Sequence, residues 1–205
     1  MPRDKTFSHE KINTAIYEEF IEKGYEAASV RSIADRAGMT AAGLYRHYPD
    51  KEAMFTAFVK PLIDEIDEWL SAHKKNHYDL LESGVKDRKQ LMENSNVDLI
   101  RDVLYPNKEV FRILVNGAKG TMYENYVHDF VNRQQADMKE TLQKMKKYGL
   151  NPNIPGDEEM HIIFSAYVAA GFEPIIHNYS KEKMESCLEA INCFFAPGWM
   201  NMMGL

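Results

Sequence analysis

The chain of 205 residues has an ordinary hydrophobic content of 44% and a formal net charge of -6. Its length allows a large core, in one domain or in a small domain joined to a larger one. No run approaches the ~18 consecutive apolar residues of a membrane span. The N-terminus has no apolar signal segment, so we expect a cytoplasmic protein without a membrane partner. Cys187 and Cys193 point apart on one predicted helix, which favours two reduced thiols.

The first predicted helix begins at Ser8 and ends at Gly24. Ser8 suits an N-cap, and Phe7 has the spacing of a hydrophobic staple with the apolar residues that follow. Those residues recur at helical spacing and form one face: Ile12, Ala15, Ile16 and Phe20. We expect this helix to support the next two rather than to carry a site.

Two short helices with a glycine turn between them come next. Ser29 suits the N-cap of a helix over residues 30–37, and Gly38 marks a sharp turn. Thr40 can cap a second helix, from residue 41 to about 47, whose buried residue is Leu44. Two short helices joined in this way are typical of a helix-turn-helix unit, which presents the start of its second helix to the DNA major groove. The alternative is an ordinary helix pair in an all-α core.

The charges around this pair are locally basic. Residues 29–51 carry four basic and two acidic side chains, whereas residues 10–26 carry five glutamates. A local basic face attracts phosphates over a Debye length of about 8–10 Å even on an acidic molecule. The overall charge of -6 therefore does not exclude DNA binding.

Residues 12–58 resemble the N-terminal domain of TetR-type transcriptional regulators. The matching positions are Ala15, Phe20, Gly24-Tyr25, Val30, Ile33-Ala34, Ala37-Gly38, Thr40, Gly43-Leu44-Tyr45, His47-Tyr48, Lys51-Glu52 and Phe55. The rest of the chain is similar only in length and helical character. The resemblance implies an all-α fold with two domains. A three-helix helix-turn-helix DNA-binding domain would span residues 1–52, with its motif at 29–48, and a larger helical ligand-binding and dimerisation domain would span 53–205.

Side-chain chemistry suggests how the motif would contact DNA. Thr40 can donate to a phosphate or a base edge, and Arg46 suits a guanine edge or a phosphate. The small residues after Thr40 would let the backbone approach the duplex. The resemblance adds contacts on the phosphate side, whereas Tyr48 is expected in the core. The candidate DNA-binding residues are Arg31, Thr40, Ala41, Ala42, Gly43, Tyr45, Arg46, His47 and Lys51.

A fourth helix is predicted from Lys51 to about His73, after Pro49 and a capping Asp50. Pro61 falls inside it, where it removes a backbone hydrogen bond and should bend the helix. The bend is either a hinge that moves the DNA-reading helices or a static kink, and one proline does not distinguish the two.

Every later segment also predicts helix. The predicted segments are a polar stretch at 82–96, a helix at 97–104, a short helix at 111–115, a helix opened by a capping box at 121–124 and ending at 149, a loop at 152–156, and helices at 160–177 and 181–195. The last two are apolar and the first of them contains small residues that permit close approach, which suits a two-fold four-helix interface. We therefore expect a homodimer through residues 157–195; burial within the monomer is the alternative.

The resemblance implies a small-molecule site among the middle helices, although such residues equally suit plain core. The candidates are Phe58, Leu62, Ile66, Trp69, Arg101, Phe111, Met122, Tyr126, Phe130, Phe164 and Tyr167. The sequence thus predicts a repressor that an apolar or aromatic effector releases from double-stranded operator DNA. The alternative is a DNA-binding interaction protein of the same fold, controlled by a protein partner or by no ligand.

Catalysis has little support in the sequence. It contains no GxSxG, HExxH, paired-cysteine metal spacing or glycine-rich phosphate loop, and its seven histidines are scattered. We therefore expect no catalytic residue, no metal and no cofactor. An all-α enzyme would need a convergent set of ionisable groups in a cavity.

Overall fold

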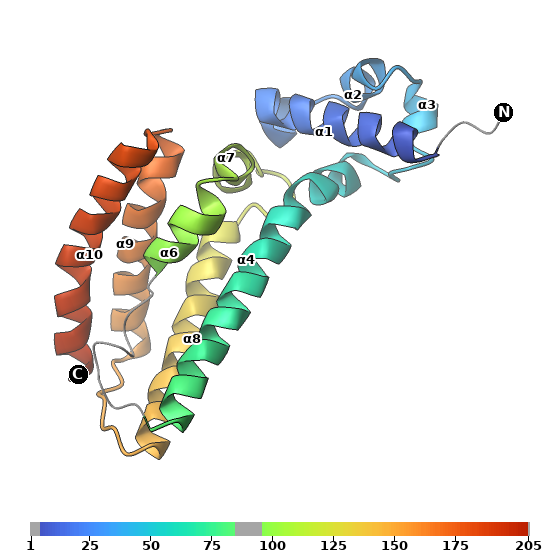
Figure 1. The fold of residues 1–205 in the computed structure, drawn as a ribbon. Coiled ribbons are helices and arrows are strands. Elements are labelled where there is room, and N and C mark those ends of the chain that lie inside the picture. Colours follow the sequence, from blue (N-terminus) through green and yellow to red (C-terminus); the bar gives the residue numbers. More distant parts are fainter. Residues whose placement is uncertain (1–4, 85–95, 205) are drawn as a thin grey trace. The chain divides into compact units, whose positions relative to one another are not determined.

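The computed structural model describes residues 5–84 and 96–204, with side chains from His9 onward and except for Asn96. Within these ranges the regular elements are all helices. The chain divides into two compact units. The first unit consists of Met1–Asp64 and Glu109–Tyr126, and the second of Glu65–Lys108 and Val127–Leu205. Figure 1 shows the helices of both units.

The first unit contains the helix-turn-helix. Its helices are α1 (Lys5–Ala27), α2 (Val30–Arg36), α3 (Ala41–Leu44), the first half of α4 (Lys51–Glu82) and α7 (Lys108–Asn116). The predicted caps at Ser29 and Thr40 are confirmed, since each side chain accepts a hydrogen bond from a backbone N–H of its helix. α1 begins at Lys5, earlier than predicted, and the side chains of Phe7 and Ser8 lie outside the described residues.

Aromatic side chains form the core of the first unit. Phe20 and Phe55 are fully buried, with their ring centroids 5.1 Å apart. Phe58 lies 5.5 Å from Phe20. The predicted apolar face of α1 is buried, as are Ile33 of α2 and Leu44 of α3. Burial of these side chains holds the two short helices against α1, which is the main stabilising force available to helices too short to be stable alone.

The segment Glu109–Tyr126 also belongs to the first unit, although no sequence pattern links it to the N-terminal helices. Gly24 breaks the helical geometry near the end of α1, with φ 67°. There the N–H of Tyr25 donates to the carbonyl oxygen of Gly117 at 2.9 Å. A Cβ on Gly24 would lie 3.6 Å from Gly117, which is an ordinary contact distance, so the glycine is required by the positive φ rather than by a lack of space.

The residues before α8 form turns. The backbone N–H of Met122 donates to Glu52 at the start of α4. Glu124 accepts a hydrogen bond from the N–H of Gly120. The helix predicted to open at residue 121 begins instead at Tyr126, because these hydrogen bonds hold the preceding residues in a turn conformation.

The second unit contains the rest of α4, then α6 (Asn96–Leu99), the π-helix η1 (Ile100–Leu104), α8 (Tyr126–Lys147), α9 (Asp157–Ile176) and α10 (Lys181–Met203). α4 continues to Glu82, beyond the predicted end, and runs through Pro61. A Cβ on Gly171 would lie 2.8 Å from Ile100, so α9 packs directly against the π-helix. The predicted polar helix at 82–96 falls largely on residues 85–95, outside the described residues.

The last two helices agree with the sequence prediction in type, but α10 continues through Pro197 to Met203, beyond the predicted end at residue 195. Ser180 caps α10 by accepting a hydrogen bond from the N–H of Lys183. α9 and α10 pack side by side (Figure 1), with Phe164 against Trp199 and Tyr167 against Phe195. Both cysteines are free thiols, as predicted. Among the helices described here, none combines the length and the hydropathy needed to cross a membrane.

Candidate nucleic-acid interface

α3, the second helix of the helix-turn-helix, ends at Leu44, before the predicted residue 47, and its start is exposed. The Thr40 side chain accepts a hydrogen bond from the N–H of Gly43 at 3.1 Å and is itself exposed. Leu44 has no exposed surface and fixes the opposite side of the helix. A hydroxyl that accepts with its oxygen still has its proton to donate, so capping leaves Thr40 able to bond a phosphate or a base edge.

The turn between α2 and α3 depends on a glycine. Gly38 has φ 69°, which is strained for other residues. The next N–H, of Met39, donates to the carbonyl oxygen of Ala34 at 2.9 Å. These two features fix the direction in which the chain leaves α2, and therefore the start of α3.

The candidate DNA-binding residues all belong to the first unit, from α2 to the start of α4. Six are exposed, namely Arg31, Thr40, Ala42, Tyr45, Arg46 and His47. The other three, Ala41, Gly43 and Lys51, are partly exposed. The structure thus combines small residues at the start of α3 with cationic and aromatic side chains that follow it.

Lys51 makes contacts within the protein that its sequence position did not indicate. Its ammonium donates to the carbonyl oxygen of Ala28 at 2.9 Å and approaches that of Glu26 at 3.4 Å. It also lies 4.4 Å from the centroid of the Tyr25 ring. Two of the three ammonium protons thus point to carbonyl oxygens at the end of α1, where the helix dipole favours a cation.

The residues that follow α3 contact side chains of α1. The Tyr48 hydroxyl donates to the side-chain oxygen of Asn13 at 2.9 Å, and Tyr48 is partly buried. The His47 ring stands edge-to-face against His9, with centroids 4.8 Å apart. The segment that carries Tyr45 and Arg46 is therefore held between α3 and these contacts.

A buried carboxylate that the sequence did not predict, Glu19, contacts α2. Glu19 has no exposed surface and accepts four hydrogen bonds. We call it and its four donors the Glu19 cluster: Glu19, Lys23, Ser29, Ser32 and Arg36. The signal was present in the spacing, because residue 19 occupies the next helical position of the apolar face that contains Ile12 and Ile16.

The pKa of Glu19 reflects two opposing causes. Burial alone would raise it, but the hydrogen bonds from the Ser32 hydroxyl, the Lys23 ammonium and the Ser29 N–H outweigh burial and lower the pKa to about 2. Glu19 is therefore ionised at any pH at which the protein works. Arg36 also pairs with Glu18 and Glu22, so three carboxylates surround its guanidinium.

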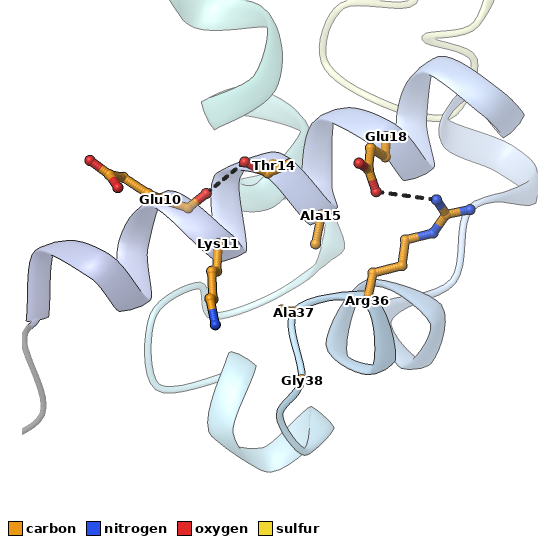
Figure 2. A pocket seen from close by; sticks show the side chains of 8 residues that line it. All are labelled: Glu10, Lys11, Thr14, Ala15, Glu18, Arg36, Ala37 and Gly38. Carbon is orange, nitrogen blue, oxygen red and sulfur yellow. Dashed lines mark hydrogen bonds and ion pairs between the residues drawn. The ribbon is translucent and has the colours of Figure 1, made fainter.

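A groove runs between α1 and the end of α2, with a volume of about 430 Å³ (Figure 2). It is lined by Glu10, Lys11, Thr14, Ala15, Glu18, Arg36, Ala37 and Gly38. In it the Thr14 hydroxyl donates to the backbone carbonyl of Glu10, and Arg36 pairs with Glu18. The mixture of carboxylates and cations gives this groove no clear preference for an anion.

The candidate ligand residues lie in both units. In the first unit Phe58, Leu62, Phe111 and Tyr126 are buried, while Met122 is 72% exposed. In the second unit Ile66, Phe130, Phe164 and Tyr167 are buried and Trp69 is partly buried. Arg101 is exposed and pairs with Asp98 and Asp102. Those two carboxylates raise the pKa of Arg101 and neutralise its charge locally.

A second groove, of about 610 Å³, is lined by Tyr78, Glu140, Gln143, Lys144, Lys147 and Tyr148 in the second unit. Neither groove includes a candidate ligand residue. Across residues 5–84 and 96–204, no group of three or more histidine, cysteine, aspartate or glutamate side chains has the arrangement of a metal site.

Comparison with known proteins identifies the helix-turn-helix. Residues 12–58 match the sequence model of the bacterial regulatory proteins of the tetR family. The transcriptional activator FasR of Mycolicibacterium smegmatis is 33% identical over 66 residues, which cover 32% of this chain and 29% of FasR. The repressor KstR2 of Rhodococcus jostii is 38% identical over 47 residues, or 23% of each chain. The chain thus spans less than a third of the length of these relatives.

Solved structures extend the likeness in fold to almost the whole chain. A TetR-like regulator from Rhodococcus sp. RHA1 has a TM-score of 0.56 and 15% identity, covering 93% of this chain and 96% of its own. The regulator PfmR of Thermus thermophilus has a TM-score of 0.56 and 19% identity, covering 89% and 93%. At this identity the likeness shows the fold, which is the predicted all-α fold with an N-terminal helix-turn-helix. The N-terminal helices thus carry the sequence pattern of the tetR family, in a chain whose fold is similar to that of such regulators along most of its length.

Proposed function

We propose that this protein is a cytoplasmic transcriptional regulator that reads double-stranded operator DNA with the start of α3. The observation that carries the proposal is the exposed start of α3, where Thr40 caps a helix of small residues. Tyr45, Arg46 and His47 follow it, all exposed. Small residues permit close approach to the groove, while the larger side chains can reach phosphates and a base edge. Residues 1–52 would form the DNA-binding domain.

A homodimer would supply the second copy of this surface. α10 carries no charged residue from Ala190 to Met203, although Phe194 is 78% exposed. Ile162 of α9 is 66% exposed. Charged residues normally populate the solvent side of a helix, so an uncharged exposed side indicates a surface that another molecule covers. A second copy of α9 and α10 fits a two-fold interface, and two α3 helices would read enough base pairs for useful specificity.

The larger helical part, residues 53–205, would bind an apolar or aromatic effector that releases the DNA. In support, KstR2 and NalD of Pseudomonas aeruginosa are described as repressors, although FasR is described as an activator. The alternative is a DNA-binding interaction protein of the same fold that responds to a protein partner or to no ligand. A compound library added to the protein–DNA complex separates the two, because only the first predicts release by a small molecule.

The DNA contact is tested with the full-length protein and a duplex that the wild-type protein selects from a random library. Arg46→Ala should weaken binding and reduce the slope of log affinity against log salt by about one, because one phosphate contact is lost. Fluorescence anisotropy over a range of salt concentrations measures the slope. Lys183→Ala removes an exposed cation of the second unit and should leave the slope unchanged. An unchanged slope for Arg46→Ala would remove Arg46 from the phosphate contacts, and a wild-type protein that selects no sequence would contradict the function.

A further inference from the structure

The Glu19 cluster has a role that the exposed surface of α3 does not explain. We propose that Glu19 is a positioning residue for DNA recognition, which fixes α2 and the turn that leads to α3 without touching DNA itself. The inference rests on the proposed function. It concerns the orientation of the recognition helix, whereas that function concerns its contacts.

One carboxylate, that of Glu19, accepts hydrogen bonds from both ends of α2. Oε1 of Glu19 accepts from the Lys23 ammonium at 2.9 Å and from the Ser29 N–H at 3.1 Å. Its Oε2 accepts from the Ser32 hydroxyl at 2.6 Å and from Nε of Arg36 at 3.1 Å. Ser29 is the N-cap of α2 and Arg36 is its last residue. Four donors match the full capacity of a carboxylate, so the side chain has one favourable orientation.

The path from α2 to the recognition helix is short. Arg36 lies two residues before the turn at Gly38, and the N–H of Met39 donates to the carbonyl oxygen of Ala34 in α2. Thr40, the cap of α3, is the next residue. A shift at the end of α2 would therefore pass straight to the start of α3.

The charge of Arg36 is used inside the protein. Its guanidinium pairs with Glu18, Glu19 and Glu22, which are all on α1. A cation surrounded by three carboxylates has little attraction left for a phosphate. Arg36 thus lies close to the recognition surface but serves to fasten α2.

Burial alone does not account for a glutamate at this position. An apolar side chain would continue the face formed by Ile12 and Ile16 and would avoid the cost of burying a charge. Hydrogen bonds to a charged group are directional and roughly twice as strong as neutral ones. Glu19 therefore contributes a fixed orientation of α2 that an apolar contact does not supply.

Glu19→Gln tests the inference because it keeps the size of the side chain. One carboxylate oxygen becomes an amide NH₂ group, which cannot accept a hydrogen bond from the two donors that face it. We expect the affinity for the selected duplex to fall about tenfold, the equivalent of about 1.4 kcal/mol. Affinity for random duplexes and its salt dependence should stay as in the wild type, because no phosphate contact is lost.

Glu22→Gln is the matched control. It makes the same charge change on the same helix and also removes a partner of Arg36, but Glu22 is 58% exposed and does not contact the other donors of the Glu19 cluster. It should keep the wild-type ratio of affinities for selected and random duplexes. Both variants are measured as full-length protein by competition anisotropy.

The ratio of the affinities for selected and random duplexes distinguishes a positioning role of Glu19 from a loss of folded protein. If Glu19→Gln lowers both affinities equally, or lowers neither, the inference is overturned. If the variant does not fold, Ser32→Ala decides, because it removes only one of the four hydrogen bonds; the ratio should then fall about threefold. An unchanged ratio in a folded Ser32→Ala protein overturns the inference, and a wild-type protein that enriches no sequence overturns the proposed function as well.

Discussion

The two compact units depart from the usual placement of residues in opposite ways. The first unit buries a carboxylate completely, at Glu19, whereas the second exposes 78% of a phenylalanine, at Phe194. The buried charge is satisfied by four donors of its own unit. The exposed ring has an edge-to-face neighbour, Phe195, but most of its surface faces solvent. The first unit thus keeps a charge inside its structure, while the second exposes an apolar surface, where we propose that a second copy of the chain binds.

The largest effect should come from placing a charge on the apolar surface. We expect Phe194→Asp to weaken the proposed homodimer about 1,000-fold, or by about 4 kcal/mol, because an aromatic contact at the proposed interface would be replaced by a buried, unpaired carboxylate. Sedimentation velocity over a dilution series measures the change. Met122→Asp is the control, since Met122 is 72% exposed but belongs to the first unit. A Phe194→Asp protein that remains dimeric at every dilution would place the interface elsewhere.

The sequence predicted those parts of the fold that depend on local signals. The caps at Ser29, Thr40 and Ser180 each follow from a hydroxyl that satisfies a free backbone N–H within the next few residues. The turn at Gly38 follows from the positive φ that glycine permits. The apolar face of α1 follows from helical spacing.

The features that the sequence did not reveal depend on partners far along the chain. Gly24 was predicted to end a helix, but its contact with Gly117 required the fold to bring residues 93 positions apart together. Residues 121–124 have the sequence signature of a helix start. Hydrogen bonds to Glu52 and within the segment hold these residues in a turn instead, so α8 begins at Tyr126. Glu19 was counted only as one of the glutamates of the first helix, because its donors lie 4 to 17 positions away along the chain.

A second, smaller effect should appear in acid. The pKa of the Glu19 carboxyl is about 2 in the folded protein and about 4.5 when unperturbed. The unfolded chain therefore takes up the proton first as the pH falls, and protonation favours unfolding. The contribution of Glu19 is fully present above pH 4.5, is lost as the pH falls through about 2, and is on the order of 3 kcal/mol.

Hydrogen exchange of the α2 amides across this pH range measures that contribution in the first unit. Tryptophan fluorescence would report the other unit, since Trp69 and Trp199 both belong to it. The wild type should lose protection between pH 4.5 and 2, whereas Glu19→Gln should be less protected at neutral pH and change less. Glu22→Gln should follow the wild type. Equal acid sensitivity of wild type and Glu19→Gln would show that the carboxylate does not fasten α2.

The smallest effect should come from ion pairs on the surface of the second unit. The Lys74 ammonium lies 2.7 Å from Asp137 and 2.8 Å from Glu140, and joins α4 to α8. Hydrogen bonds to these two carboxylates raise the pKa of Lys74, yet Glu140 is 59% exposed. Solvent and salt screen such a pair, so Lys74→Ala should lower the free energy of unfolding of the second unit by less than about 1 kcal/mol.

Urea unfolding followed by tryptophan fluorescence, at low and at high salt, measures this loss, which should shrink as salt increases. Lys75→Ala is the matched control, because Lys75 is the next residue of α4, is 74% exposed and, among the residues that the structure describes, pairs with Asp79 of its own helix. Lys75→Ala should lower the free energy of unfolding by still less, since the Lys75–Asp79 pair lies within one helix. A loss above about 2 kcal/mol for Lys74→Ala, insensitive to salt, would be the behaviour of a buried pair. That result would show that charge fixes the geometry of both units.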